Sequence, residues 1–275
     1  MKTEIKLLIF MLTMVLLTQC EKNEANPEVK ISDNNFLNAL IELGIDTNGD
    51  GKISRSEAEA VISLDVSGTY EIPGGITDMS GIEEFVNLDT LRCNRNQLAS
   101  LDISNNQNLK YLDCGLNDLT TLALSYNTAL EFLNCEANEM ANLDLSALSN
   151  LSHLFCSDNS LSHLDLSLNT RLTRLVCGGN PLTILDVSKN TLLDSLKIVS
   201  DYSLTSLDLS NNTKLSYLLI GYVGLSTLDV SNNTELVDLT IGSCALTSLD
   251  ISNNAKLREL DCSLSRLNEL DLSNN

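Results

Sequence analysis

Positively charged side chains are scarce in this sequence. Lys and Arg number 17 against 37 Asp and Glu, which gives a formal net charge of −20, and aromatic residues make up only 4% of the chain, with no Trp. Binding to nucleic-acid phosphates needs a basic surface, and no basic stripe is present, so we expect no nucleic-acid partner. The acidic balance equally disfavours electrostatic binding to anionic membranes.

Catalytic motifs are also missing. The two histidines, His153 and His163, fall in different segments of one repeat unit, and no nucleophile elbow, HExxH motif, glycine-rich phosphate loop or Cys–His cluster occurs. We therefore expect a protein that is not an enzyme. Disorder is disfavoured too, because 43% of the residues are apolar.

The chain lacks an apolar run of membrane-spanning length. The run "LLIFMLTMVLL" follows Lys2 and Lys6 and has the length of a signal-peptide core, which predicts a signal peptide over residues 1–19. The run ends at "LLTQC", which resembles the lipidation box of bacterial lipoproteins. This resemblance implies that Cys20 carries a lipid and becomes the mature N-terminus, so that the protein is displayed at the bacterial outer membrane or cell surface, or on the periplasmic face. Gln19 departs from the small residue usual there, and an ordinary secretory signal is the alternative. Residues 20–34 are polar and aperiodic, which predicts a flexible tether.

A repeat of 21 residues occupies the rest of the chain. Leucines recur at this step from residue 88 onward, with one step of 22 residues before Leu215, and a second leucine follows each of them three residues later. The later part of each unit reads Leu-Asp-apolar-Ser, as in "LDIS" from Leu101, with Ala123 in place of Asp in one unit. A unit of this size cannot bury its apolar side chains alone, so neighbouring units must stack.

The pattern "LxxLxCxxNxLxxLDLSxNxx" resembles the leucine-rich repeats of bacterial surface lipoproteins and, more distantly, of internalins. The resemblance implies a leucine-rich-repeat solenoid of parallel β coils with a right-handed superhelix and little helix. We expect nine repeats over residues 88–275, an irregular first repeat over 67–87, and a helix-loop-helix cap over 35–66. The alternating first segment of each unit predicts a short parallel strand, and "LDLS" predicts a second extended edge.

Three side-chain columns follow from the repeat. Cys93, Cys114, Cys135, Cys156 and Cys177 share a position that Ile fills in later units, which favours free buried thiols over disulfides or a metal site. Asn96, Asn117, Asn138, Asn159 and Asn180 form a second column, which we expect to satisfy backbone groups of adjacent coils. It stops at Asp201, after which we expect less regular coils. Asp at the "LDLS" position forms the third column, interpreted as turn hydrogen bonding in preference to a cation-binding stripe.

One segment matches a calcium loop. Asp46, Asn48 and Asp50 fall at positions 1, 3 and 5, Gly51 at 6, Lys52 offers its carbonyl at 7, Ser54 lies at 9 and Glu57 at 12. Calcium requires this set of hard oxygen ligands and a sharp turn at position 6, so the sequence predicts an EF-hand-like calcium site. A chance pattern is the alternative. Sensors and dockerins carry two such loops, and we find one, which favours a structural clamp on the first coil over a calcium switch.

The outward strand positions are the candidate binding face. Aromatic residues on consecutive coils should lie next to one another and form an exposed apolar patch with an Arg at its rim, although scattered surface hydrophobes are the alternative. The candidate partner-binding residues are Tyr111, Phe132, His153, Phe155, Arg174, Val176 and Tyr217.

The function expected from these features is non-enzymatic binding of a protein or peptide on the strand face. Glycan binding by the aromatic residues in nutrient capture is a second candidate. A hydrolase carrying the repeats as an appendage is disfavoured, because nothing outside the repeats is large enough to be a catalytic domain.

Overall fold

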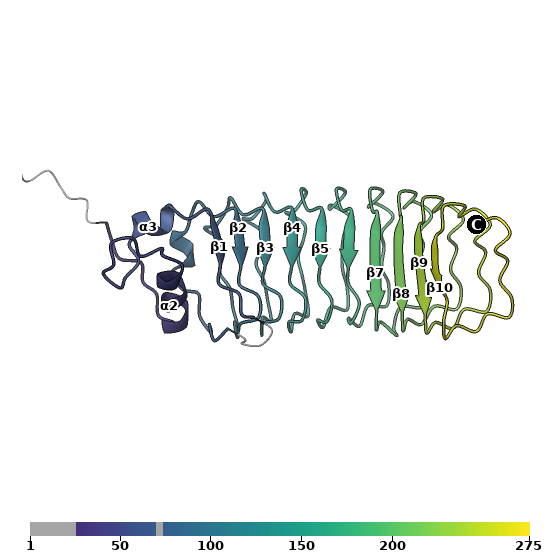
Figure 1. Ribbon diagram of the computed structural model, residues 1–275, viewed down its shortest axis with the longest axis horizontal. Coiled ribbons are helices and arrows are strands. Elements are labelled where there is room, and N and C mark those ends of the chain that lie inside the picture. Colours follow the sequence, from purple (N-terminus) through teal and green to yellow (C-terminus); the bar gives the residue numbers. More distant parts are fainter. Residues whose placement is uncertain (1–25, 70–73) are drawn as a thin grey trace, which may run out of the picture.

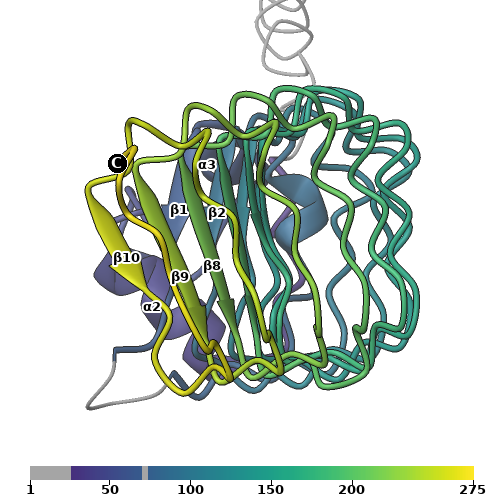
Figure 2. The same cartoon turned by 90° about the vertical axis from the view of Figure 1, so that its right-hand side faces the viewer.

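A computed structural model describes residues 26–69 and 74–275 of this chain. The described part is a rod of stacked coils with two short helices at its N-terminal end (Figure 1). Seen along the rod, the strands form one wall of a flattened ring, and irregular segments form the others (Figure 2). Within the described residues, no helix has the length and apolar character needed to cross a membrane.

The coils form one parallel ten-stranded sheet in which strand order follows chain order. The strands are β1 (Ser63–Asp65), β2 (Thr90–Arg92), β3 (Tyr111–Asp113), β4 (Phe132–Asn134), β5 (His153–Phe155), β6 (Arg174–Val176), β7 (Ser195–Val199), β8 (Tyr217–Gly221), β9 (Asp238–Gly242) and β10 (Glu259–Asp261). Each 21-residue unit contributes one of β2–β10, because its alternating segment turns Leu inward and its neighbours outward. The leucine-rich-repeat solenoid expected from the sequence is therefore confirmed.

The repeat leucines fill a continuous core along the rod. Leu91, Leu112 and Leu133 pair in register on consecutive strands and are fully buried. Their stacking buries the apolar surface that a single coil would leave exposed, at roughly 25 cal/mol per Å². The core is thus shared between neighbouring coils, and no coil has one of its own.

The N-terminal cap consists of α2 (Asn34–Glu42) and α3 (Arg55–Glu59), followed by the short 3-10 helix η1 (Ile82–Glu84) in the first coil. Helix α2 begins where the Asp33 side chain accepts the backbone N–H groups of Asn35 and Phe36, and its apolar residues Phe36 and Leu40, one turn apart, are buried. Asp33 also accepts the backbone N–H of Thr77 at 2.8 Å, so the same carboxylate joins the cap to the first coil.

Two boundaries differ from those expected. Strand β1 lies inside the 35–66 range assigned to the cap, so the sheet begins one coil earlier than the sequence indicated. The segment expected to be a flexible tether is partly packed, because Val29 is buried and its N–H donates to the carbonyl of Ile53 at 2.7 Å. Residue 28 forms an antiparallel bridge with Ser54 in the calcium loop.

The "LDLS" segments were expected to form a second extended edge. Their side chains alternate as expected, with Leu101 and Ile103 buried and Asp102 exposed, but these segments form no strand in the described part of the chain. Coils are joined there by a rear asparagine column that the sequence reasoning missed, although "LDLSxN" displays it. Its members are Asn106, Asn127, Asn169, Asn190, Asn212, Asn233, Asn254 and Asn275.

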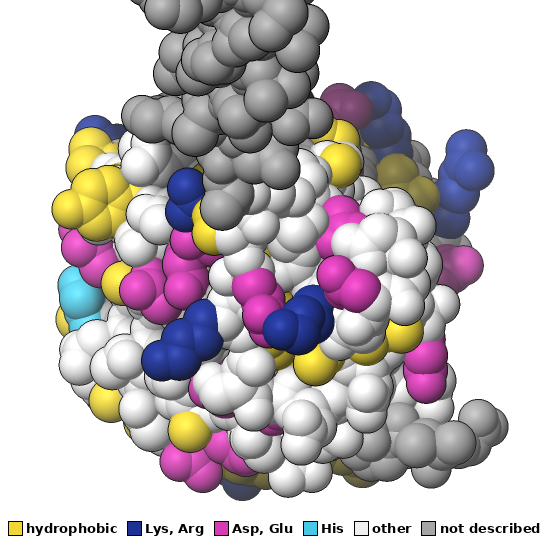
Figure 3. All heavy atoms as spheres, turned by 90° about the vertical axis from the view of Figure 1, so that its left-hand side faces the viewer, with side chains coloured by type: hydrophobic (Ala, Val, Ile, Leu, Met, Phe, Trp, Pro, Cys, Tyr) yellow, Lys and Arg dark blue, Asp and Glu magenta, His cyan; other side chains and the backbone are white. Residues whose placement is uncertain are grey.

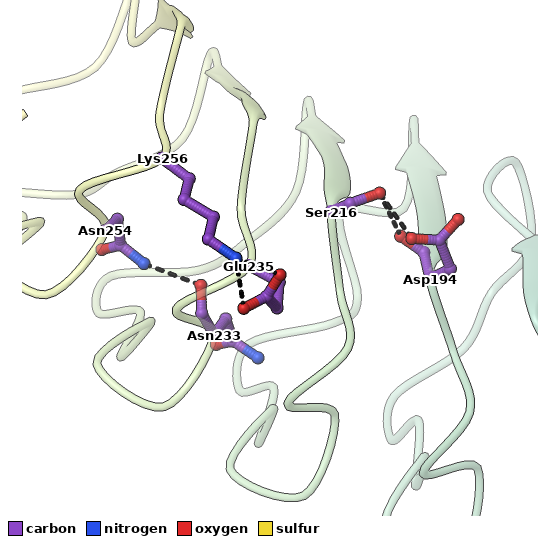
Figure 4. Close-up of polar contacts among 6 residues, drawn as sticks. All are labelled: Asp194, Ser216, Asn233, Glu235, Asn254 and Lys256. Atoms are coloured by element: carbon purple, nitrogen blue, oxygen red, sulfur yellow. Dashed lines mark hydrogen bonds and ion pairs between the residues drawn. The ribbon is translucent and has the colours of Figure 1, made fainter.

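Each member of the rear asparagine column donates to backbone carbonyls of the coil before it. Asn254 Nδ2, for example, donates to the carbonyl of Asn233 at 2.9 Å (Figure 4). Surface contacts between coils accompany the column, including the ion pair of Lys256 with Glu235 (Figure 4). Side-chain amides therefore link the rear wall of the rod, while backbone hydrogen bonds link its strand wall.

The later coils were expected to be less regular after Asp201. Strands β7, β8 and β9 are instead five residues long, whereas β2–β6 have three. Ile198, Ile220 and Ile241 pair with one another in this part of the sheet at the position that Cys occupies earlier. The strands are thus longer, with more backbone pairing between coils, beyond the point where the column from Asn96 to Asn180 stops.

Candidate functional site

The strand wall places the same repeat position of successive coils side by side. Tyr111 pairs with Phe132 and Phe132 with His153 at the first outward position, while Asn134 pairs with Phe155 at the other. Neighbouring strands in a sheet lie about 4.8 Å apart, which is within stacking distance for planar side chains. The register therefore aligns aromatic residues that are 21 residues apart in sequence.

Four side chains on β3, β4 and β5 form a contiguous aromatic array, made of Tyr111, Phe132, His153 and Phe155. The rings of Tyr111 and Phe132 stack with centroids 4.1 Å apart and planes 7° apart. Phe132 also lies 6.0 Å from the His153 ring and 5.3 Å from the Phe155 ring. The structure thus brings together four of the seven residues that we predicted for the binding face.

An arginine lies at each end of the aromatic array. The guanidinium carbon of Arg92 is 4.4 Å from the centre of the Tyr111 ring, and that of Arg174 is 5.5 Å from the centre of the Phe155 ring. Both distances are within the range of cation–π attraction. Arg174 was predicted and Arg92 was missed, although Arg92 holds the same repeat position as Phe155 in an earlier unit.

The array is less exposed than the sequence indicated. Its rings are half-buried because they cover one another, and Val176, beside Phe155, is only 9% exposed. Tyr217 is set apart, since Ser195 separates it from Arg174 along the sheet. Tyr217 therefore lies on the same wall but outside the aromatic array.

Burial and neighbouring charges shift the pKa values of ionisable groups on this wall. Burial, and to a smaller extent the charge of Arg174, lowers the pKa of His153, so its ring is neutral at pH 7. Its Nδ1 lies 2.8 Å from the hydroxyl oxygen of Ser152. Burial raises the pKa of Asp113 and also that of Tyr217.

The predicted calcium loop folds around its own carboxylates. Asp46 accepts the backbone N–H groups of Gly49 and Gly51, each at 2.8 Å. Gly49 and Gly51 have φ of 75° and 78°, a conformation in which side chains are strained, so glycine suits both turns. Gly51 thus supplies the sharp turn that a calcium loop needs at position 6.

Glu57 closes this loop from its last position. One of its oxygens accepts the N–H and the hydroxyl of Thr47, and the other accepts the N–H and the hydroxyl of Ser54. The hydrogen bonds from Ser54 and Thr47 lower the pKa of Glu57 to about 2, so the carboxylate is ionised at neutral pH.

The donor types and the turn fit calcium. Within the described residues, however, no three acidic, histidine or cysteine side chains converge closely enough to hold a metal by themselves. Binding would therefore also need the amide oxygen of Asn48 and the carbonyl of Lys52, and calcium stays a prediction.

The end of the rod that carries the cap has a mixed surface. Acidic and basic side chains lie interspersed there among uncharged ones (Figure 3). The predicted lipidation residue Cys20 and the predicted signal peptide lie outside the described residues. The lipid anchor therefore stays a prediction.

The cysteine and aspartate columns are accounted for by packing and turns. All seven described cysteines are free, and all are buried except Cys262, which is partly exposed. Burial raises the pKa of Cys156 to about 12, so its thiol stays protonated and unreactive. In the aspartate column, each carboxylate accepts the N–H of the serine two residues later, as Asp208 does from Ser210 at 2.9 Å.

Comparison with known proteins identifies the fold. No protein-family model matches the chain, and no curated protein matches its sequence. Among solved structures, the functional domain of InlJ from Listeria monocytogenes, described as including a cysteine ladder, is 32% identical with a TM-score of 0.70 over 91% of this chain and 61% of that one. A leucine-rich-repeat protein of Leptospira interrogans is 23% identical, with a TM-score of 0.68 over 78% of this chain and 58% of that one.

A eukaryotic structure shares the same fold. It is the ectodomain of the Arabidopsis thaliana receptor kinase GASSHO1/SCHENGEN3 in complex with Casparian strip integrity factor 2, 24% identical with a TM-score of 0.62 over 75% of this chain and 27% of that one. The chain thus spans less than two thirds of these proteins. With its ten parallel strands and its 21-residue units, it is a leucine-rich-repeat solenoid similar to those of bacterial leucine-rich-repeat proteins.

Proposed function

We propose that this solenoid is a non-enzymatic module that binds a protein or peptide through the aromatic array. The main support for this proposal is the continuous row of side-chain contacts that runs from Arg92 through the rings of the array to Arg174. Aromatic and arginine side chains are the residues enriched at energetically dominant positions of protein interfaces. Rings that already pack against one another lose little conformational entropy when a partner binds.

The ring geometry favours a protein over a glycan. Tyr111 has Arg92 from β2 on one face and Phe132 from β4 on the other, so neither face of this ring is free to stack on a sugar. What the array offers to a ligand is ring edges, and apolar or carboxylate groups of a protein can contact these edges.

We also propose that the protein is displayed by a lipid on Cys20 and that calcium holds the cap. Cap and first coil are tied by the ion pair of Arg55 with Glu84 at 2.7 Å and by Asp33. A loop stiffened by calcium would hold α3, and with it Arg55, against the end of the solenoid.

A capture experiment tests the binding proposal. The immobilised chain and its Phe132→Ala variant would be exposed to the same surface-protein extract, with Leu168→Ala as the control. Leu168 is 57% exposed and lies outside the strand wall. We expect a retained protein to be lost with Phe132→Ala and kept with Leu168→Ala. Equal retention by all three chains would reject the aromatic array as the binding site. Repeating the capture in a calcium chelator tests whether calcium acts as a switch, which would change partner binding, or as a structural clamp.

A further inference from the structure

Basic side chains gather on the part of the strand wall around the aromatic array, in contrast to the whole chain, where they are scarce. Among the outward positions of β1–β7, three side chains are basic, Arg92, Arg174 and Lys197, and two are acidic, Asp65 and Asp113, which lie on either side of Arg92. Burial raises the pKa of Asp113, and the charge of Arg92 lowers it to a smaller extent. Glu136 lies near Asp113 and raises that pKa further. Basic side chains therefore outnumber acidic ones at these outward strand positions, in a molecule of net charge −20.

Both arginine side chains pack on aromatic rings and form no ion pair in the described part of the chain. The ion pairs of the described residues join Lys52 to Glu28, Arg55 to Glu84 and Lys256 to Glu235, and none of them involves Arg92 or Arg174. Asp65 and Asp113 lie on the strands next to Arg92 without forming such a pair. Packing on a ring restrains the planar guanidinium and leaves its N–H edge free for another group. A carboxylate is the group that this edge binds with two parallel hydrogen bonds.

The spacing of the arginines sets the spacing of their ligands. Arg92 and Arg174 lie on β2 and β6, four strand steps apart, which corresponds to about 19 Å at 4.8 Å per step. An extended peptide advances about 3.3 Å per residue, so two carboxylates about six residues apart would span this distance. Between the arginines, the half-buried rings of Tyr111, Phe132 and Phe155 would face the middle of the peptide.

We propose that the aromatic array recognises an extended acidic segment of a partner protein, with two carboxylates about six residues apart on either side of apolar side chains. This proposal rests on the binding function proposed above and specifies its partner. The segment crosses the strands of β2–β6, with one carboxylate on Arg92 and the other on Arg174. Its apolar side chains lie against the ring edges.

The test uses synthetic peptides with blocked ends and a fluorescent label. The probe is Glu-Ser-Phe-Ser-Phe-Ser-Glu, compared with the peptide that has Lys at both ends and with one that has its two Glu three residues apart. We expect the first peptide to bind at least about tenfold more tightly than either of the others, and we expect added salt to weaken its binding. No binding of the first peptide up to about 1 mM, or equal binding of all three, would overturn the proposal.

Arginine variants make the test specific. Arg92→Gln and Arg174→Gln should each weaken the first peptide about tenfold, since each removes one bidentate contact. Arg171→Gln is the matched control, because Arg171 lies outside the strands and bonds to Asn150, and it should change nothing. If Phe132→Ala abolishes capture of a protein partner while both arginine variants bind normally, the acidic-segment proposal fails and the binding function stands.

Discussion

Single residues decide how well one coil joins the next. In the column at the strand ends, Asn180 donates to the carbonyls of Cys156 at 3.0 Å and Cys177 at 2.9 Å, and its oxygen accepts the N–H of Leu161. Asp201 occupies the corresponding place one coil later and is almost fully buried. A carboxylate cannot donate, so this junction lacks the two amide hydrogen bonds that the earlier junctions have.

Asp201→Asn should stabilise the protein, and more so as the pH rises. Burial raises the pKa of Asp201 from 3.8 to about 6, against the smaller lowering effect of the backbone N–H groups of Ser203, Leu182 and Leu204. Between these two values the folded protein keeps a proton that the unfolded chain has released, so the contribution of this residue to stability falls as the pH rises through about 4 to 6. We expect the variant to gain about 1–2 kcal/mol at pH 7.5 and less at pH 4.

Urea unfolding of both proteins at the two pH values measures this difference. Asp208→Asn, on the exposed aspartate column, is the control for removal of one negative charge. A gain that is equal at both pH values would show that the Asp201 carboxyl does not titrate in this range.

At the scale of elements, two coils approach each other closely at the junction of β6 and β7. Gly178 follows Cys177 where the strands lengthen, and a methyl group on it would overlap the backbone N and O of Val199. Gly221 holds the same repeat position two coils later, and there the nearest atoms to an added methyl would lie 3.8 Å away. The two glycines therefore differ in how closely neighbouring coils approach them.

Gly178→Ala should be strongly destabilising and Gly221→Ala nearly neutral. The first substitution forces two coils apart, which we expect to cost about 2–4 kcal/mol, whereas the second fits existing space. Thermal or urea unfolding of the pair compares them directly. Similar losses of stability in both variants would contradict this account of the junction.

The cap is the second element with a measurable contribution. If calcium clamps it, chelation should lower the melting temperature and increase hydrogen exchange in the cap and first coil but not in β7–β9. Glu57→Gln should remove most of the calcium dependence, because it removes the last carboxylate of the loop. Glu59→Gln, on the same helix, serves as the control. A chelator that changes partner affinity alone would favour the calcium switch.

At the scale of the whole molecule, charge is distributed along the rod with a regular period. The aspartate column repeats one exposed carboxylate per coil over most of the rod, and hydrogen bonds to the following serine lower the pKa values of these groups. All of them are therefore ionised at neutral pH and repel their neighbours.

Salt should therefore stabilise this protein. We expect its melting temperature to rise when NaCl increases from about 10 mM to about 200 mM, because the screening length falls from about 30 Å to about 7 Å, less than two coil spacings. Asp208→Asn should reduce this rise slightly, since Asn keeps the turn acceptor and removes one charge. Calorimetry at the two salt concentrations measures this effect. A melting temperature that falls with salt would show that repulsion between these carboxylates is not a main contribution to stability.

The sequence predicts the coil architecture well because the repeat is local and periodic. The 21-residue spacing places Leu112 and Cys114 inward, and the structure buries both. Aromatic neighbours such as Tyr111 and Phe132 follow from the same register. Their stacking, and the packing of Arg92 on Tyr111, depend on side-chain directions that spacing does not contain. The packed segment before the calcium loop was missed because its pairing with residue 54 is a tertiary contact without a periodic signal.

The hydrogen bonds of the rear asparagine column also all run in one direction along the chain, which bears on the order in which the coils can assemble. Every amide in it donates to carbonyls 21 to 25 residues earlier, as Asn127 does to Ile103 and Asn106 and Asn212 does to Val187 and Asn190. During synthesis or export from the N-terminus, the acceptors of each coil emerge before the donors that need them. On this wall, each new coil can therefore bond to a coil that is already in place, and assembly can proceed one coil at a time, starting from the cap.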